Sequence, residues 1–156
     1  MPKIDIAKAV RRTGSSYPEH LQAVCLGREK LVLGNAADLT QFGVNLTRIM
    51  PGAASALRHW HEAEDEFIYM LEGELMLIEE GGETLLRPGD AAGFKAGVAD
   101  GHCLVNKSDR DALYLEIGSR AAHERCHYPG NDLVMVRDPG VQMFTRKSGE
   151  PYPQKK

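Results

Sequence analysis

The stretch GAASALRHWHEAEDEFIYMLEG, residues 52–73, gathers histidine and carboxylate side chains between two glycines. His59 and His61 are one residue apart, and Glu66 opens the apolar run that follows. On a β-strand, residues i and i+2 face the same side, so both imidazoles would enter one space. A hairpin-like return of the chain would bring Glu66 beside them. Imidazole and carboxylate groups together suit first-row divalent metals. The stretch therefore predicts a metal site, with a charged surface turn as the alternative.

Short apolar runs separated by glycine and proline surround this stretch. Pro51-Gly52 and Pro88-Gly89 read as turns, and Gly81-Gly82 reads as the turn of a tight hairpin. Many short strands at close spacing are typical of an all-β sandwich or barrel. The expected strands are 42–50, 67–71, 75–78, 83–87, 91–94, 102–106 and 112–117.

The length of 156 residues fits a single domain, 1–156, with a core over about residues 40–118. The first 35 and last 35 residues are less regular and are expected to add an extra strand or a short helix. These flanking segments could pair across an interface. A homodimer is therefore the expected assembly, since two-fold dimers are the commonest one.

The bulk composition excludes several classes of partner. A net charge of −3 leaves no basic stripe to neutralise phosphates, so nucleic acid is not expected as the partner. The chain has no apolar run long enough for a membrane span and no signal-peptide apolar region at its start, which predicts a cytoplasmic protein. The three cysteines are too few and too scattered for a disulfide framework, so reduced, buried thiols are expected.

The residues from 52 to 73 resemble the first motif of the cupin superfamily. The matching positions are Gly52, His59, His61, Glu66 and Gly73. The spacing from His61 to Gly73 fits the motif. Six residues separate Gly52 from His59, one more than the motif commonly has.

A second stretch, FKAGVADGHCLVN at residues 94–106, is similar to the second cupin motif. Gly89, Gly97, His102 and Asn106 align with it, while Lys95 stands where proline is usual. Four residues separate Gly97 from His102, two more than is common. The two motifs together extend the resemblance over about residues 40–118.

The resemblance implies a double-stranded β-helix, or jelly-roll barrel, with a divalent metal near its mouth. The implied ligands are His59, His61, Glu66 and His102, and the metal could be Zn, Fe, Mn or Ni. An octahedral ion held by four side chains would keep two positions for water or substrate, which permits Lewis-acid chemistry or O₂ binding on iron.

Three functions stay open at this stage because a cupin fold does not determine one. The first is a metal-dependent enzyme acting on a small molecule, with isomerase chemistry on a sugar or sugar phosphate slightly favoured. The second is an iron-dependent dioxygenase of a small organic substrate. The third is a non-enzymatic ligand-binding or sensing protein. The catalytic residues are undetermined, and Tyr114 and Glu116 are the candidates to move a proton.

Other polar residues have simpler readings. Glu62, Glu64 and Asp65 are expected to form a solvated acidic turn at the barrel mouth, with an acid or base role near the metal as the alternative. Cys126, His127 and His123 match no usual metal-site spacing, so no second metal cluster is expected there.

Strand alternation indicates to which face the side chains next to the histidines point. Cys103 and Trp60 neighbour ligand histidines and should point to the opposite face, whereas Asn106 shares a face with His102 and could hold a ligand in place by a hydrogen bond. Arg48, Arg58 and Lys95 could attract an anionic substrate, although exposed basic side chains are the commoner outcome.

Overall fold

The computed structural model describes residues 3–153, which form antiparallel strands with a few helical turns. The expected all-β class is confirmed. The helical turns are η1 (Ile6–Lys8), η2 (Glu19–Cys25) and α1 (Leu33–Ala36). Within the described residues, no helix is long and apolar enough to cross a membrane.

The largest sheet has six strands and joins the N-terminal flank to the middle of the chain. Its order is β1-β2-β3-β10-β5-β8. The strands are β1 (Val10–Thr13), β2 (Arg28–Val32), β3 (Phe42–Ile49), β10 (Ala112–Ser119), β5 (Glu66–Glu72) and β8 (Ala91–Phe94).

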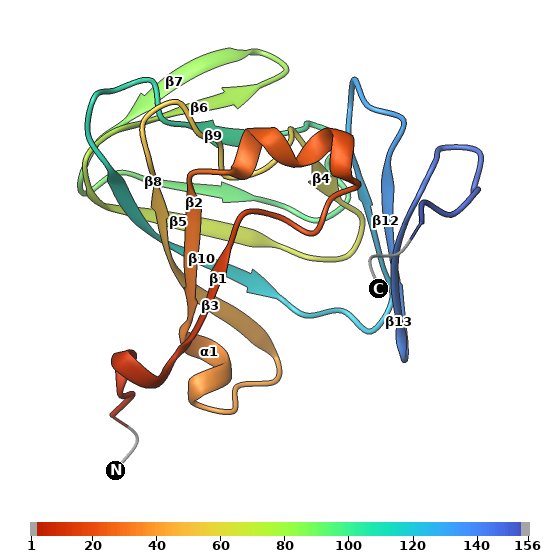
Figure 1. Cartoon of the computed structure of the whole chain (residues 1–156), viewed down its shortest axis with the longest axis horizontal. Helices are drawn as coiled ribbons and strands as arrows, with labels where there is room; N and C mark the ends of the chain where they lie inside the picture. The colour runs from red at the N-terminus through yellow and green to blue at the C-terminus, as the bar shows by residue number, and fades with distance from the viewer. Residues whose placement is uncertain (1–2, 154–156) are drawn as a thin grey trace.

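Two smaller sheets complete the architecture. One has the order β7-β6-β9, with β7 (Gly82–Leu86), β6 (Leu75–Glu79) and β9 (Cys103–Val105). The other has the order β13-β12-β11-β4, with β13 (Val141–Thr145), β12 (Val134–Asp138), β11 (Glu124–His127) and β4 (Trp60–His61). In Figure 1 the blue strands β12 and β13 lie at one side of the molecule, and the red turn η1 lies at the other. Over residues 3–153 the strands form three separate hydrogen-bonded sheets rather than one continuous closed ladder.

The alternation of side chains along each strand builds the core. On β5, Ile68 and Met70 are buried while Phe67, Tyr69 and Leu71 are exposed, as the period of two along a strand requires. The main core cluster lies between the six-stranded and three-stranded sheets and includes the buried Tyr114. A second cluster joins Tyr17 and Cys25 of the N-terminal flank to Cys126, Tyr128 and other residues of the C-terminal flank.

The expected strands coincide with β3 and β5 to β10 within one or two residues. Two local expectations were wrong. The hairpin turn is Glu80-Gly81, because Gly82 already pairs with Glu79. The short strand β4 does not form a hairpin with β5, because β4 pairs with β11 and β5 pairs with β8 and β10. The C-terminal flank is also more regular than expected, since it supplies three strands.

Candidate metal centre

Three imidazoles from two segments of the chain converge on one carboxylate oxygen. Glu66 Oε2 lies 2.8 Å from Nε2 of His102 and 3.5 Å from Nε2 of both His59 and His61. All four residues are mostly buried, with side-chain exposures between 8% and 22%. The structure thus brings together the four ligands that the sequence predicts, although metal binding itself stays a prediction.

The imidazole of His59 is held in one orientation by a backbone hydrogen bond. Its Nδ1 lies 2.8 Å from the carbonyl oxygen of Leu57. A carbonyl only accepts hydrogen bonds, so Nδ1 carries a proton and Nε2 is the nitrogen that faces the centre of the cluster. His102 is held differently, by a stacked Phe94 ring whose centroid lies 3.5 Å away.

The unusual loop before His102 is anchored at both ends. The backbone N–H of Gly97 donates to the His61 carbonyl at 2.8 Å, and Gly97 has a φ of +77° that disfavours other residues. At Gly101, a Cβ atom would lie 2.9 Å from the Pro129 ring. His59 and His102 then exchange backbone hydrogen bonds of 3.0 and 2.9 Å. The two extra residues of the loop therefore leave His102 opposite His59.

Electrostatics within the cluster favour a bound cation. Burial opposes ionisation of Glu66, but the imidazoles of His102, at a hydrogen-bond distance of 2.8 Å, and of His59 and His61 hold its pKa well below its usual value. Burial lowers the pKa of His61, but hydrogen bonds with Cys126 and Glu66 outweigh it and raise the pKa to about 11. Burial lowers the pKa of His102. In the metal-free cluster a proton thus supplies the positive charge that Glu66 needs, and a divalent ion can replace it.

The donor set fits a divalent transition metal. Three imidazole nitrogens cannot all donate good hydrogen bonds to one carboxylate oxygen, yet all three point at it. One group of metal-capable atoms within 4.8 Å of one another contains His59, Glu66 and His102. Nitrogen and oxygen donors of this kind suit Zn, Fe, Mn or Ni.

An inner cavity of about 160 Å³ opens beside the cluster and is lined by all four of its residues. The same cavity is lined by Tyr114 and Glu116. Lys30 lies 2.6 Å from Glu116 Oε1, Asn45 donates to the same oxygen at 3.0 Å, and the Tyr114 hydroxyl donates to Oε2 at 3.3 Å. A second carboxylate therefore faces the space next to the predicted metal.

An outer pocket of about 210 Å³ touches His61, Glu66 and His102 from another side. Lys95 lines this pocket. The other two basic candidates do not line either space, because Arg48 pairs with Asp111 at 3.2 Å and Arg58 pairs with Glu80 at 2.8 Å.

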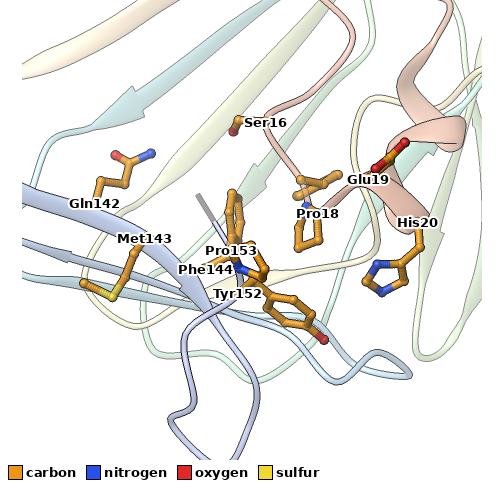
Figure 2. Close-up of a pocket in the computed structure, with 10 residues that line it drawn as sticks. Ser16, Pro18, Glu19, His20, Gln142, Met143, Phe144, Tyr152 and Pro153 are labelled. Atoms are coloured by element: carbon orange, nitrogen blue, oxygen red, sulfur yellow. The ribbon is translucent and has the colours of Figure 1, made fainter. Parts of the chain in front are cut away.

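A larger pocket of about 530 Å³ lies away from the cluster, between the start of η2 and strand β13. Figure 2 shows Pro18, Glu19 and His20 on one side and Met143 and Phe144 on the other. In residues 3–153, no metal-capable group includes a residue of this lining. Its volume alone therefore does not make it the reactive site.

The acidic turn was expected to be solvated throughout, and one of its three residues is buried instead. Glu62 and Asp65 are exposed, but Glu64 is only 7% exposed. Its carboxylate lies 2.5 Å from Nη1 of Arg137 and accepts the backbone N–H of Ala121 at 2.8 Å. The expectation for Glu64 was wrong because a cation from β12, far along the chain, folds over it.

Asn106 does not support a ligand in the way the sequence indicated. Its amide donates to the carbonyls of Ile49 and Arg110 at 2.8 and 2.7 Å, and its oxygen accepts from Ser108. The side chain therefore fixes the turn after β9. Cys103 belongs to none of the metal-capable groups in the described part of the chain, in agreement with strand alternation.

Two residues of β11 enter the site without having been predicted. Glu124 is fully buried, accepts the backbone N–H groups of Glu62 and Ala63, and lies 3.9 Å from Nδ1 of His61. Cys126 is the Cα partner of His61 across the β4–β11 pair. No local signal marks them, because this pairing joins residues 65 positions apart.

Comparison with known proteins identifies the family. The family model of the cupin domain matches residues 45–118. A sugar phosphate isomerase of the cupin superfamily from Silicibacter pomeroyi DSS-3 is 45% identical, with a TM-score of 0.92 and 97% of each chain covered. The chain belongs to the cupin superfamily.

A second solved structure is more distant. A candidate sugar phosphate isomerase from Acidithiobacillus ferrooxidans ATCC 23270 is 28% identical, with a TM-score of 0.73, and the match covers 82% of this chain and 81% of that one. Among curated proteins, no sequence matches the chain.

Proposed function

We propose that this cupin is a metal-dependent isomerase of a small sugar or sugar phosphate, built as one domain on a jelly-roll barrel. The observation that carries the proposal is the convergence of His59, His61 and His102 on Glu66 at the wall of a cavity that also holds Glu116. The 45% identity to a sugar phosphate isomerase supports the substrate class.

The four cluster residues would hold one divalent ion, which supplies Lewis-acid polarisation of a carbonyl or hydroxyl group of the substrate. Glu116 is the residue proposed to move the proton. Burial opposes its ionisation, but the charge of Lys30 holds its pKa below 4.5, so it enters the reaction as a carboxylate. Lys30 and Asn45 occupy Oε1. Oε2 accepts a longer hydrogen bond, from the Tyr114 hydroxyl at 3.3 Å, and is the oxygen that takes a proton from one substrate carbon and returns it to the neighbouring carbon.

Lys95 provides the charge for the non-reacting end of the substrate. It lines the outer pocket that shares His61, Glu66 and His102 with the inner cavity. An ammonium group at this position would attract a phosphate, so phosphorylated sugars should react with lower KM than free sugars.

The experiment is a proton-exchange assay on protein whose metal content has been measured. Aldose and ketose phosphates are incubated in D₂O, and ¹H NMR follows both interconversion and deuterium uptake at carbon. Glu116→Gln should lower kcat by about 10²- to 10⁴-fold, the usual contribution of a proton-transfer residue. Glu72→Gln makes the same change at an exposed position of β5 and should have no effect.

Other results would favour the other functions. O₂ consumption by iron-loaded protein would support the dioxygenase. Tight binding of a metabolite without turnover, seen as a rise in Tm, would support a sensing protein. Absence of turnover and of exchange over the whole panel of sugars and sugar phosphates contradicts the isomerase.

We also propose a cytoplasmic homodimer. Phe67, Tyr69 and Leu71 project from the outer face of β5 and are 38% to 43% exposed, and β10 places Leu115 opposite Tyr69 and Ile117 opposite Phe67. Monomers rarely expose a contiguous apolar patch of this kind, and a second copy of the same face would cover it. Sedimentation velocity should show a dimer that Tyr69→Glu converts to a monomer.

A further inference from the structure

Cys126 lies inside the same space as the predicted ligands. It is 1% exposed and lines the inner cavity. In the β4–β11 pair its Cα partner is His61. Residues directly opposite each other in an antiparallel pair point to the same face, with Cβ atoms about 4.5–5.5 Å apart. The thiol and the His61 imidazole are therefore neighbours on the inner face.

The sulfur is also close enough to a second histidine to share a metal with it. His59, His61 and Cys126 each offer one ligand atom, and the three atoms lie within 4.8 Å of one another. With metal–nitrogen distances of about 2.1 Å and metal–sulfur distances of about 2.3 Å, opposite donors on one ion lie about 4.4 Å apart. His59 belongs both to this group and to the group with Glu66 and His102, so the two groups adjoin at this imidazole.

We propose that Cys126 is a sulfur donor to the metal held by His59, His61, Glu66 and His102. The inference rests on the metal binding in the proposed function and extends it by one ligand from the C-terminal flank. On binding, the S–H bond breaks, a sulfur–metal bond forms and the thiol proton passes to solvent. A thiolate favours zinc, iron, cobalt and copper over manganese.

The other two cysteines are matched controls. Cys25 and Cys103 are also buried and reduced. Within residues 3–153, neither belongs to a metal-capable group. Replacing each cysteine with serine makes the same chemical change at three buried positions, of which one faces the cluster.

The test is the absorption spectrum of protein loaded with Co²⁺. Wild type, Cys25→Ser and Cys103→Ser should show a near-ultraviolet thiolate-to-cobalt charge-transfer band, and Cys126→Ser should lose it while keeping visible cobalt bands. Zn²⁺ affinity should also fall relative to Mn²⁺ affinity in Cys126→Ser. If Cys126→Ser does not fold, X-ray absorption of zinc-loaded wild type decides, because sulfur at about 2.3 Å is expected.

The outcomes separate the two proposals. Two results would overturn the sulfur ligand and leave the proposed function standing. In one, wild-type protein shows visible cobalt bands but no charge-transfer band. In the other, the charge-transfer band survives in Cys126→Ser. Wild-type protein that binds neither Co²⁺ nor Zn²⁺ overturns both.

Discussion

The middle of the chain and its two flanks contribute to the site in different ways. Residues 59–102 supply the four predicted ligands. Glu116, a little further along the chain, supplies the second carboxylate of the inner cavity. The flanks supply groups that contact those side chains or their neighbours: Lys30 lies against Glu116, and Glu124 lies beside His61. Arg137 pairs with Glu64, which lies 3.9 Å from Nδ1 of His61. A motif thus identifies which residues meet a metal, whereas the position and charge of those residues depend on segments outside it.

The largest effect should come from a ligand in the middle region. His61→Ala removes one of the imidazoles that converge on Glu66, so metal affinity should fall more than about 100-fold, since partners of ligands alone contribute about 10- to 100-fold. Elemental analysis after dialysis measures the loss. His20→Ala, an exposed histidine of the larger pocket, should retain the metal content of wild type. Full metal occupancy in His61→Ala would contradict the ligand assignment.

The next largest effect concerns the C-terminal flank and is a loss of folding stability. Arg137→Met leaves the buried Glu64 carboxylate without its cation, and breaking a buried pair in this way should cost about 3 kcal/mol of unfolding free energy. Urea unfolding of metal-free protein provides the measurement. The exposed pair Lys107–Glu83 offers the comparison, because Lys107→Met should cost less than about 1 kcal/mol. Equal losses in the two variants would show that Arg137 is no more than a surface charge.

The N-terminal flank should produce a smaller and pH-dependent effect. Lys30 holds the pKa of Glu116 below 4.5, so the pair stabilises the fold above that pH and loses its contribution as the pH falls through the folded-state pKa. Lys30→Met should therefore cost about 2 kcal/mol at neutral pH, the usual size of a hydrogen bond between charged groups, and the difference from wild type should shrink below about pH 4.5. Urea midpoints across this range test it, and a pH-independent difference would contradict the role of the ion pair.

The smallest effect should come from the carboxylate behind His61. Glu124→Gln keeps the shape of the side chain but weakens its hold on the turn at Glu62 and Ala63 and on Nδ1 of His61. Metal affinity should fall about tenfold. Calorimetric titration with Zn²⁺ measures it, with Glu72→Gln as the isosteric control. An affinity equal to that of the control would assign Glu124 to the backbone turn alone.

The sequence predicted the middle region well because its signals are local. Alternating side chains and glycine turns define β3 and β5 to β10, and a spacing of two places His59 and His61 on one face. The buried state of Glu64 and the approach of Cys126 could not be predicted in the same way. Each depends on a strand that pairs or packs across more than 60 residues, for which the chain carries no local pattern.

Trp60 has a practical consequence for following the site in solution. It is the one tryptophan of the chain, lies between two predicted ligands, and stacks on His127 with ring centroids 4.4 Å apart. It also lines the outer pocket together with His61, Glu66 and His102. Emission excited selectively at tryptophan therefore reports from a single place in the molecule. The natural protein carries its own fluorescent probe at the entrance to the cluster, and no label has to be introduced to watch it fill.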